Sequence, residues 1–229
     1  MNVLIACEES QRVCKAFRDK GHNAFSCDIE DESGGFPQWH IKQDVLTLLN
    51  GNCSFTTCDG ETHTITGKWD MIIAFPPCTH LATSGARHFE KKRADGRQRE
   101  GIEFFAQFLM ADCDKIVIEN PVGIISGEYI KKWFPDLCEK YGLPQKPTQI
   151  IQPWMFGDNA QKTTCFWIKG VEPLTPYVTE KPELEFFEWV DKKTGKVKRQ
   201  HLFHYQSRSG KERSKTFFGV ALAMAEQWG

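Results

Sequence analysis

The 229-residue sequence contains no apolar run close to the roughly 20 residues that a transmembrane helix needs. We therefore expect no membrane span. The first residues, Met1 to Ala6, have no basic flank and soon reach Glu8 and Glu9, so we expect no signal peptide either. Internal repeats and low-complexity tracts are also missing, which argues against a repeat array or a disordered linker.

The nine cysteines are odd in number and show no tight pairing. A disulfide framework is therefore not expected, and the cysteine pattern favours a reducing, cytoplasmic setting. Cys53, Cys58 and His63 lie near one another, but no fourth zinc ligand is evident. We predict no metal site there, and instead a hairpin over residues 54–66 that turns at Asp59–Gly60.

The net charge of −1 conceals an uneven distribution. Residues 192–215 hold nine Lys/Arg and one acid, and residues 87–99 hold six and two, so these segments carry +8 and +4 and the remainder −13. Two basic segments on an acidic body favour binding to nucleic-acid phosphates, with solvated loops as the alternative. Trp189 lies just before the second segment, where either core packing or base stacking remains open.

Short apolar runs alternate with helical patterns along most of the chain, which predicts an α/β fold with a doubly wound parallel sheet. We expect a helix that begins at a Ser10 cap and ends near Gly21, and a second helix carrying an apolar stripe from Ile102 to Leu109. A polar, basic stretch from Thr79 to about Arg97 precedes that second helix. The expected strands cover residues 3–6, 23–28, 40–44, 71–75, 115–118 and 164–168.

Polar side chains follow several of these strands, at the edge where ligands bind in such sheets. Most are acids, and one is a cysteine: Glu8, Glu9, Asp28, Asp44, Cys78 and Glu119. Two prolines before Cys78 restrict its backbone, which helps a nucleophile by fixing its position. Nearby cations such as Arg87 would increase its thiolate fraction. A cysteine that adds to a ring beside an acid that polarises it suits pyrimidine activation.

Two motifs at these strand ends resemble those of DNA cytosine-C5 methyltransferases. Phe75-Pro76-Pro77-Cys78 resembles the family's Pro-Cys motif, and Glu119-Asn120-Pro121 resembles its Glu-Asn-Val motif. The segment 161–166 resembles a weakened form of the family's Gln-x-Arg-x-Arg motif. The run 218–223 resembles the family's last motif, a helix that returns to the cofactor domain. In place of the family's Phe-x-Gly-x-Gly loop the chain reads Ala6-Cys7-Glu8-Glu9-Ser10, without glycine. The sequence as a whole most resembles the compact, phage- or prophage-type members of this family.

This resemblance implies a Rossmann-like, S-adenosylmethionine-dependent methyltransferase fold with a small target-recognition insertion. It divides the chain into a cofactor-binding and catalytic domain (residues 1–170), a target-recognition region (171–213) and a C-terminal helix that returns to the first domain (214–229). S-adenosylmethionine is the implied cofactor. The residues expected around it are Ala6, Cys7, Glu8, Asp28, Ile29, Asp44, Val45 and Pro76.

The resemblance also implies a mechanism, in which the Cys78 thiolate adds to C6 of a flipped-out cytosine and Glu119 holds the base edge. Lys162 is expected to steady the base or the loop, double-stranded DNA is the implied partner, and we expect a monomer. The residues expected to contact the base or the DNA are Phe75, Pro77, Asn120, Pro121, Arg87, Arg97 and Arg99.

Three other functions remain open. A DNA amino-methyltransferase uses Asp/Asn/Ser-Pro-Pro-aromatic, and here the outer positions are Phe75 and Cys78, which fill neither role. An enzyme of C5 chemistry could use a modified cofactor or act on uracil. A methyltransferase fold could also serve only to bind DNA, although such a protein has no chemical need for Cys78 and Glu119.

Overall fold

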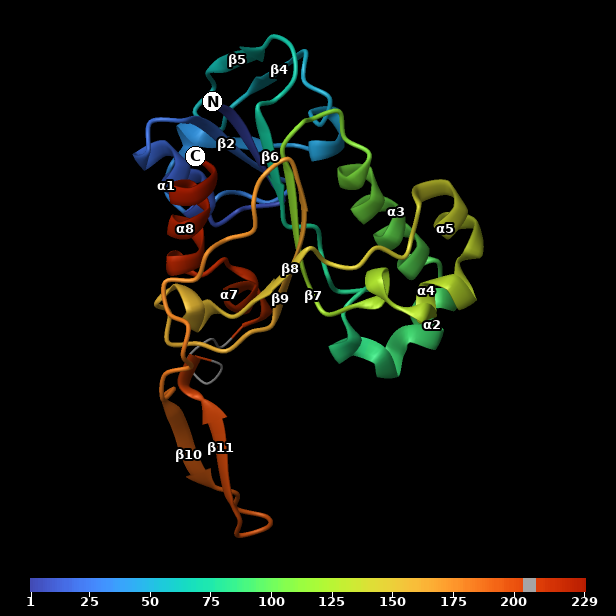
Figure 1. The fold of residues 1–229 in the computed structure, drawn as a ribbon, viewed down its shortest axis with the longest axis vertical. Coiled ribbons are helices and arrows are strands. Elements are labelled where there is room, and N and C mark those ends of the chain that lie inside the picture. Colours follow the sequence, from blue (N-terminus) through green and yellow to red (C-terminus); the bar gives the residue numbers. More distant parts are fainter. Residues whose placement is uncertain (204–208) are drawn as a thin grey trace.

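The centre of the protein is a seven-stranded sheet, seen in a computed structural model that describes residues 1–203 and 209–229 (Figure 1). The strand order is β3-β2-β1-β6-β7-β9-β8. The first five strands in this order run parallel, and β9 runs antiparallel to both of its neighbours. The strands are β1 Asn2–Ala6, β2 Asn23–Asp28, β3 His40–Lys42, β6 Met71–Ala74, β7 Ile116–Pro121, β8 Gln149–Ile151 and β9 Thr164–Lys169.

Helices cover both faces of this sheet, because its central strands are apolar on both sides. Val3, Ile5 and Ile73 point to one face, where they pack with α1 (Arg12–Asp19) and α8 (Phe218–Trp228). Neighbouring positions such as Leu4, Ile72 and Ile118 point to the other face, towards α3 (Arg97–Leu109). The expectation of a mixed α/β protein with a largely parallel, covered sheet is therefore confirmed.

A small helical lobe lies beside α3 (Figure 1). It contains the short helices η3 Thr83–His88, α2 Phe89–Ala94, η4 Ile124–Ser126, α4 Glu128–Trp133 and α5 Pro135–Tyr141. The polar, basic stretch 79–97 is therefore mostly helical. It is ordered because Leu81 and Phe89 are buried in the same core as α3.

Two hairpins stand apart from the central sheet. The predicted hairpin at residues 54–66 is present as β4 (Cys53–Thr56) and β5 (Thr62–Ile65), with Gly60 in the left-handed conformation at its turn (φ 91°). No metal-binding cluster occurs among residues 1–203 and 209–229. The second hairpin, β10 (Phe186–Val190) with β11 (Val197–His201), projects away from the body (Figure 1).

Other expected elements differ in detail. The third strand ends at Lys42, because Asp44 instead caps the short helix η2 (Val45–Thr47) by accepting a bond from Leu46 N. Ser10 does not cap α1; Glu8 does this. The C-terminal helix expected from Ser214 begins at Phe218 as α8, and a separate short helix, α7 (Gly210–Ser214), ends at Ser214. The remaining short helices are η1 Pro37–Trp39 and η5 Pro153–Phe156. None of the described helices combines the length and apolarity needed to cross a bilayer.

Candidate active site

The candidate site lies at the carboxyl edge of the parallel strands. Strand β1 lies between β2 and β6. The strand order continues through β2 on one side of β1 and through β6 on the other, and this reversal creates the crevice where open α/β sheets bind ligands. Phe75 extends β6 by donating its N–H to the carbonyl of Ala6 (2.9 Å). The two motifs that suggested chemistry therefore follow adjacent strands, β6 and β7, at this edge.

The turn that carries Cys78 is held from both sides. The buried amide of Asn120 donates to the carbonyl of Pro76 (2.8 Å). On the other side, the carbonyl of Cys78 accepts bonds from the N–H groups of Leu81 and Ala82 (both 2.9 Å). Asn120, expected to contact DNA, is only 2% exposed, so its side chain positions the turn instead.

The segments that follow the two motifs also pair with each other. Ala82 forms an antiparallel bridge with Gly123, and Ile124 N–H donates to the carbonyl of Leu81 (3.0 Å). A Cβ atom on Gly123 would lie 2.7 Å from that carbonyl oxygen, closer than real Cβ atoms approach. Glycine is therefore required here, and the segment after Cys78 is joined directly to the segment after Glu119.

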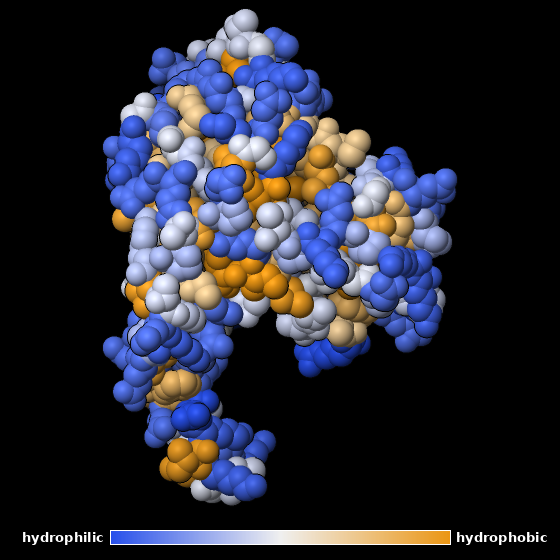
Figure 2. All heavy atoms as spheres, viewed as in Figure 1, coloured by the Kyte–Doolittle hydropathy of each residue, from blue (hydrophilic) through white to orange (hydrophobic). Residues whose placement is uncertain are grey.

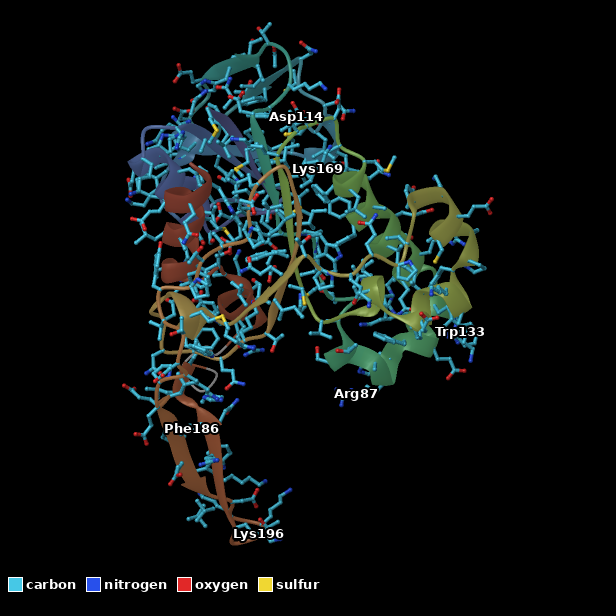
Figure 3. All side chains as sticks on the ribbon, viewed as in Figure 1. Arg87, Asp114, Trp133, Lys169, Phe186 and Lys196 are labelled. Carbon is cyan, nitrogen blue, oxygen red and sulfur yellow. The ribbon has the colours of Figure 1, made fainter. Side chains whose placement is uncertain are left out.

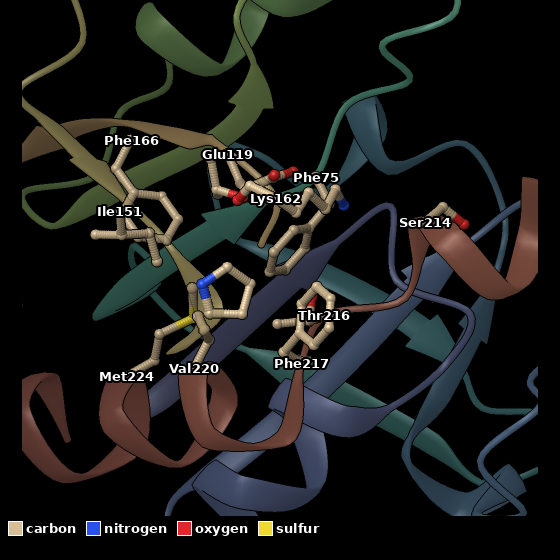
Figure 4. Close-up of a pocket in the computed structure, with 12 residues that line it drawn as sticks. Phe75, Glu119, Ile151, Lys162, Phe166, Ser214, Thr216, Phe217, Val220 and Met224 are labelled. Atoms are coloured by element: carbon tan, nitrogen blue, oxygen red, sulfur yellow. The ribbon is translucent and has the colours of Figure 1, made fainter. Parts of the chain in front are cut away.

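Lys162 reaches the same site from the next strand. Because β9 is antiparallel to β7 and pairs Thr164 with Pro121, the residues just before β9 lie near the end of β7. Lys162 and Glu119 accordingly line one pocket with Phe75 (Figure 4). Its other walls come from η5, the strands and the C-terminal segment: Ile151, Pro153, Thr164, Phe166, Ser214, Thr216, Phe217, Val220 and Met224.

Cys78, Glu119 and Lys162 influence one another electrostatically. Burial raises the pKa of the Glu119 carboxyl, and the Lys162 ammonium partly opposes this. Burial likewise raises the pKa of the Cys78 thiol, and the Glu119 carboxylate raises it further, whereas Lys162 and Lys92 lower it. A thiol, an acid whose pKa is raised by burial and a cation therefore lie close enough to influence one another, and Glu119 and Lys162 line the same pocket.

Lys92 is a site residue that the sequence did not single out. Its side chain is 9% exposed, and its ammonium donates to the carbonyl of Thr79, one residue after Cys78. The available signal was its spacing three residues after Phe89, which places both on the inward face of α2. Arg87, the cation proposed for this role, is instead exposed and donates to His88 Nε2 (2.9 Å).

The other predicted DNA contacts are placed as follows. Arg97 pairs with Asp95, two residues before it, and Arg99 pairs with Asp136 of α5 (2.7 Å), which links α3 to the helical lobe. Pro77 is exposed beside Cys78, whereas Pro121 is half-buried in the β7–β9 pairing. Figure 3 shows Arg87 at the edge of the lobe that faces the β10–β11 hairpin.

The predicted cofactor residues gather at the ends of β1, β2 and β3. Cys7 adopts the left-handed conformation (φ 58°), so the turn after β1 forms without the glycine found in the family loop. Asp28 and Asp44 both raise the pKa of the Cys7 thiol, after the larger effect of burial, which places the two acids close to this turn. Ile29 is 75% exposed beside Asp28, whereas Ala6, Val45 and Pro76 are buried.

Glu8 has a structural role at this edge. Its buried carboxylate accepts the backbone N–H groups of Val13 (2.7 Å) and Cys14 (3.1 Å), the donors at the start of α1. Burial raises the pKa of Glu8 to about 7, although these two bonds act in the opposite direction. The N-terminus of α1 is therefore occupied by a side chain of the protein itself.

No protein-family model matches the sequence, and no curated protein matches it.

Proposed function

We propose that the protein is a DNA methyltransferase that transfers a methyl group from S-adenosylmethionine to C5 of cytosine. The observation that carries this proposal is the shared position of Cys78, Glu119 and Lys162 at the carboxyl edge of the sheet. Addition to a pyrimidine needs a fixed sulfur nucleophile and a proton donor for the ring nitrogen. The pairing of both motifs and the Asn120–Pro76 bond supply the fixed geometry.

The proposed reaction has three steps: addition of the thiolate, methyl transfer and elimination. The Cys78 thiolate forms a bond to C6 of the flipped-out cytosine, the C5–C6 double bond opens, and the Glu119 carboxyl donates its proton to N3. S-adenosylmethionine, when bound, supplies the methyl group that C5 accepts. The C5 proton then passes to solvent water, which restores the C5–C6 double bond and expels the Cys78 thiolate, while the N3 proton returns to Glu119. Burial raises the pKa of Glu119, which favours the protonated form that this donor role requires.

The residues at the cofactor edge fit S-adenosylmethionine better than a dinucleotide. The carboxylate of Glu8 already uses the N–H groups at the start of α1, where a pyrophosphate would otherwise bind. S-adenosylmethionine has no phosphate, and its sulfonium is compatible with the nearby acids Asp28 and Asp44. Half-buried Asp28 would accept bonds from the ribose hydroxyls, and exposed Ile29 offers an apolar surface to adenine.

Double-stranded DNA is the proposed substrate because basic elements flank the site. The lobe that bears Arg87 and the β10–β11 hairpin lie on either side of a hollow in the surface (Figures 2 and 3). The hollow opens below the carboxyl edge of the sheet, where the candidate site lies. A duplex between the two basic elements would bring a flipped base to Cys78.

The alternative of C5 chemistry on uracil, or with a modified cofactor, uses the same three side chains. A carboxyl that donates a proton at N3 suits cytosine, whose N3 is an acceptor, whereas uracil presents an N3–H there, so the raised pKa of Glu119 fits cytosine better than uracil. An amino-methyltransferase leaves the position of Cys78 beside Glu119 without a purpose.

The proposal is tested by incubating the protein with duplex DNA and methyl-labelled S-adenosylmethionine, and then identifying the labelled nucleoside. We expect label in 5-methylcytosine, abolished in Cys78→Ala and reduced about 10²- to 10⁴-fold in Glu119→Gln. Label in N6-methyladenine or N4-methylcytosine would overturn the assigned role of Cys78.

A second readout tests the covalent step itself. Duplex DNA that contains 5-fluorocytosine cannot complete the reaction by losing a C5 proton, so the adduct through Cys78 should accumulate and survive denaturing electrophoresis. The matched control is Cys165→Ala, since Cys165 also lies near Glu119 but is buried within β9. This variant should still form the adduct, and an adduct in Cys78→Ala would refute the assignment.

A further inference from the structure

Residues 209–217, which we call the strap, run from the cofactor edge of the sheet to the catalytic pocket. The strap contains α7 and three residues that line the pocket with Lys162 and Glu119, namely Ser214, Thr216 and Phe217 (Figure 4). All five residues of α7 are exposed, so this helix places no side chain in the hydrophobic core. The position of the strap is therefore set mainly by its polar contacts with other segments.

Two of these contacts fasten the strap near its ends. At one end, the ammonium of Lys211 pairs with the carboxylate of Glu30, in the loop after β2 (2.5 Å). At the other end, Arg12 of α1 donates to the carbonyl of Thr216 (2.8 Å), and its guanidinium lies 4.2 Å from the centre of the Phe218 ring. Side chains that are distant in the sequence thus hold both ends.

A third contact lies between the two ends and belongs to the catalytic site. Lys162 donates from its ammonium to the carbonyl of Arg213 (3.2 Å). The same ammonium lowers the pKa of the Cys78 thiol and of the Glu119 carboxyl. Because a lysine carries its charge on a flexible stem, the Arg213 carbonyl helps to determine where that charge lies.

The end of the strap at Glu30 also meets the expected cofactor edge. Glu30 donates its N–H to Asp28 Oδ1 (3.0 Å). The bond to Glu30 raises the pKa of the Lys211 ammonium, and the charges of Glu9 and Asp28 raise it further, so this ammonium lies near three acids. A single exposed ion pair contributes little to the stability of a domain, but it can set the position of a segment that has no core contact.

We propose that Lys211 is a positioning residue for the candidate active site: its pair with Glu30 fastens the strap, and the strap holds Lys162 at the site. The inference rests on the proposed function and adds to it a residue outside both catalytic motifs. When the pair is lost, one end of the strap is released and the Arg213 carbonyl no longer fixes the Lys162 ammonium. The charge that favours the Cys78 thiolate then lies farther from the sulfur on average.

The test measures the rate at which iodoacetamide alkylates Cys78 in the full-length protein, without cofactor or DNA, by peptide mass spectrometry. Lys162→Met gives the size of the effect when the charge itself is removed. Lys211→Met should slow alkylation at pH 8 in the same direction, by roughly two- to five-fold, because only the thiolate attacks. Lys211→Arg keeps the ion pair and should restore the wild-type rate.

Removal of the partner distinguishes positioning from a direct effect of charge. If Lys211 acted on Cys78 only through space, Lys211→Met and Glu30→Ala would change the alkylation rate in opposite directions, because they remove charges of opposite sign. Positioning predicts that both variants slow alkylation. The matched control is Lys15→Met, since the Lys15–Asp19 pair has the same length (2.5 Å) and nearly the same exposure but lies within α1. This control should react as the wild type does.

Several results would overturn the inference: a wild-type rate in Lys211→Met, opposite shifts in Lys211→Met and Glu30→Ala, or equal losses in Lys211→Met and Lys15→Met. An unchanged rate in Lys162→Met would do the same, since the strap would then hold no charge that Cys78 senses.

These measurements are independent of methyl transfer. If alkylation responds as expected but the wild type labels no nucleoside, the proposed function fails and the inference stands. If the wild type methylates cytosine while Cys78 of Lys211→Met reacts at the wild-type rate, the inference fails and the function stands.

Discussion

At the scale of single residues, the reactivity of Cys78 depends on a balance of charges. Burial and Glu119 raise the pKa of its thiol, whereas Lys162 and Lys92 lower it. Since only the thiolate attacks, the two lysines keep the sulfur usable in a setting that otherwise favours the neutral thiol. Lys162 also lowers the pKa of Glu119, so it acts on both groups, while Lys92 acts on the sulfur.

Lys92→Met tests this balance without removing any group of the proposed reaction. The pKa of the Cys78 thiol should rise, because a nearby positive charge is lost while the side-chain volume is nearly kept. The readout is the rate of iodoacetamide alkylation at Cys78 between pH 7 and 10, resolved by peptide mass spectrometry because the chain has nine cysteines. Arg87→Met, which removes an exposed cation, should leave the midpoint unchanged; equal shifts in both variants would contradict the assignment.

At the scale of elements, the turn after β1 shows how the sheet edge is built without glycine. Cys7 and Gln11 both adopt left-handed backbone conformations, and Glu8 lies between them and caps α1. A buried carboxyl with a pKa raised to about 7 holds its proton more tightly in the folded protein than in the unfolded chain, where the usual value is 4.5. Its stabilising contribution is therefore full below about pH 4.5 and is lost as the pH rises towards 7.

Glu8→Gln should consequently flatten the pH dependence of folding. In the wild type, the Glu8 contribution to the free energy of unfolding should decrease between pH 5 and 7 by at most about 1.4 kcal/mol per pH unit. Urea denaturation at pH 5, 6, 7 and 8 measures this, with Glu9→Gln as a control that keeps the wild-type slope. Curves that stay parallel for the wild type and Glu8→Gln would show that Glu8 does not titrate in this range.

The bond between Asn120 and Pro76 joins two elements of the site. Asn120→Ala leaves the buried carbonyl of Pro76 without its donor, which should cost about 1–3 kcal/mol of unfolding free energy. The Cys78 turn should also loosen, so turnover should decrease by more than the affinity for the cofactor. Asn23→Ala removes an amide whose bond to Asn2 is exposed, and should change stability by less than about 0.5 kcal/mol. Similar losses in the two variants would argue against a positioning role for Asn120.

At the scale of the whole molecule, the sequence predicted what depends on local patterns. The apolar runs at β1 and β6 identify buried strands, and the two proline-containing motifs mark the sheet edge where Cys78 and Glu119 lie. Lys162 was found only through the resemblance, since its position depends on β9 running antiparallel to β7. The spacing of Lys92 from Phe89 marks it as inward-facing, but its bond to Thr79 depends on how α2 packs against the Cys78 turn. Glu8 acts locally at the start of α1, where the sequence favoured Ser10 as the cap. A basic stretch such as 87–99 likewise does not reveal that Arg97 and Arg99 are paired within the lobe.

The two hairpins lead to a last prediction, because they have the same architecture but different relations to the core. Phe55 and Ile65 of β4–β5 are buried in the main apolar cluster, whereas no residue of β10 or β11 belongs to either cluster. Replacing residues 186–201 with a short Gly-Ser linker should therefore leave the urea midpoint and the affinity for S-adenosylmethionine close to those of the wild type. Duplex DNA binding should be lost in this variant.

Phe55→Ala provides the contrast, with an expected cost of about 3–5 kcal/mol, because it empties a core position. Circular dichroism during urea denaturation and calorimetric titration with S-adenosylmethionine measure both effects. A hairpin deletion that lowers the midpoint as much as Phe55→Ala would mean that β10–β11 supports the fold. Retained stability together with lost DNA binding would instead identify it as a separable DNA-contacting arm on a self-sufficient cofactor-binding body.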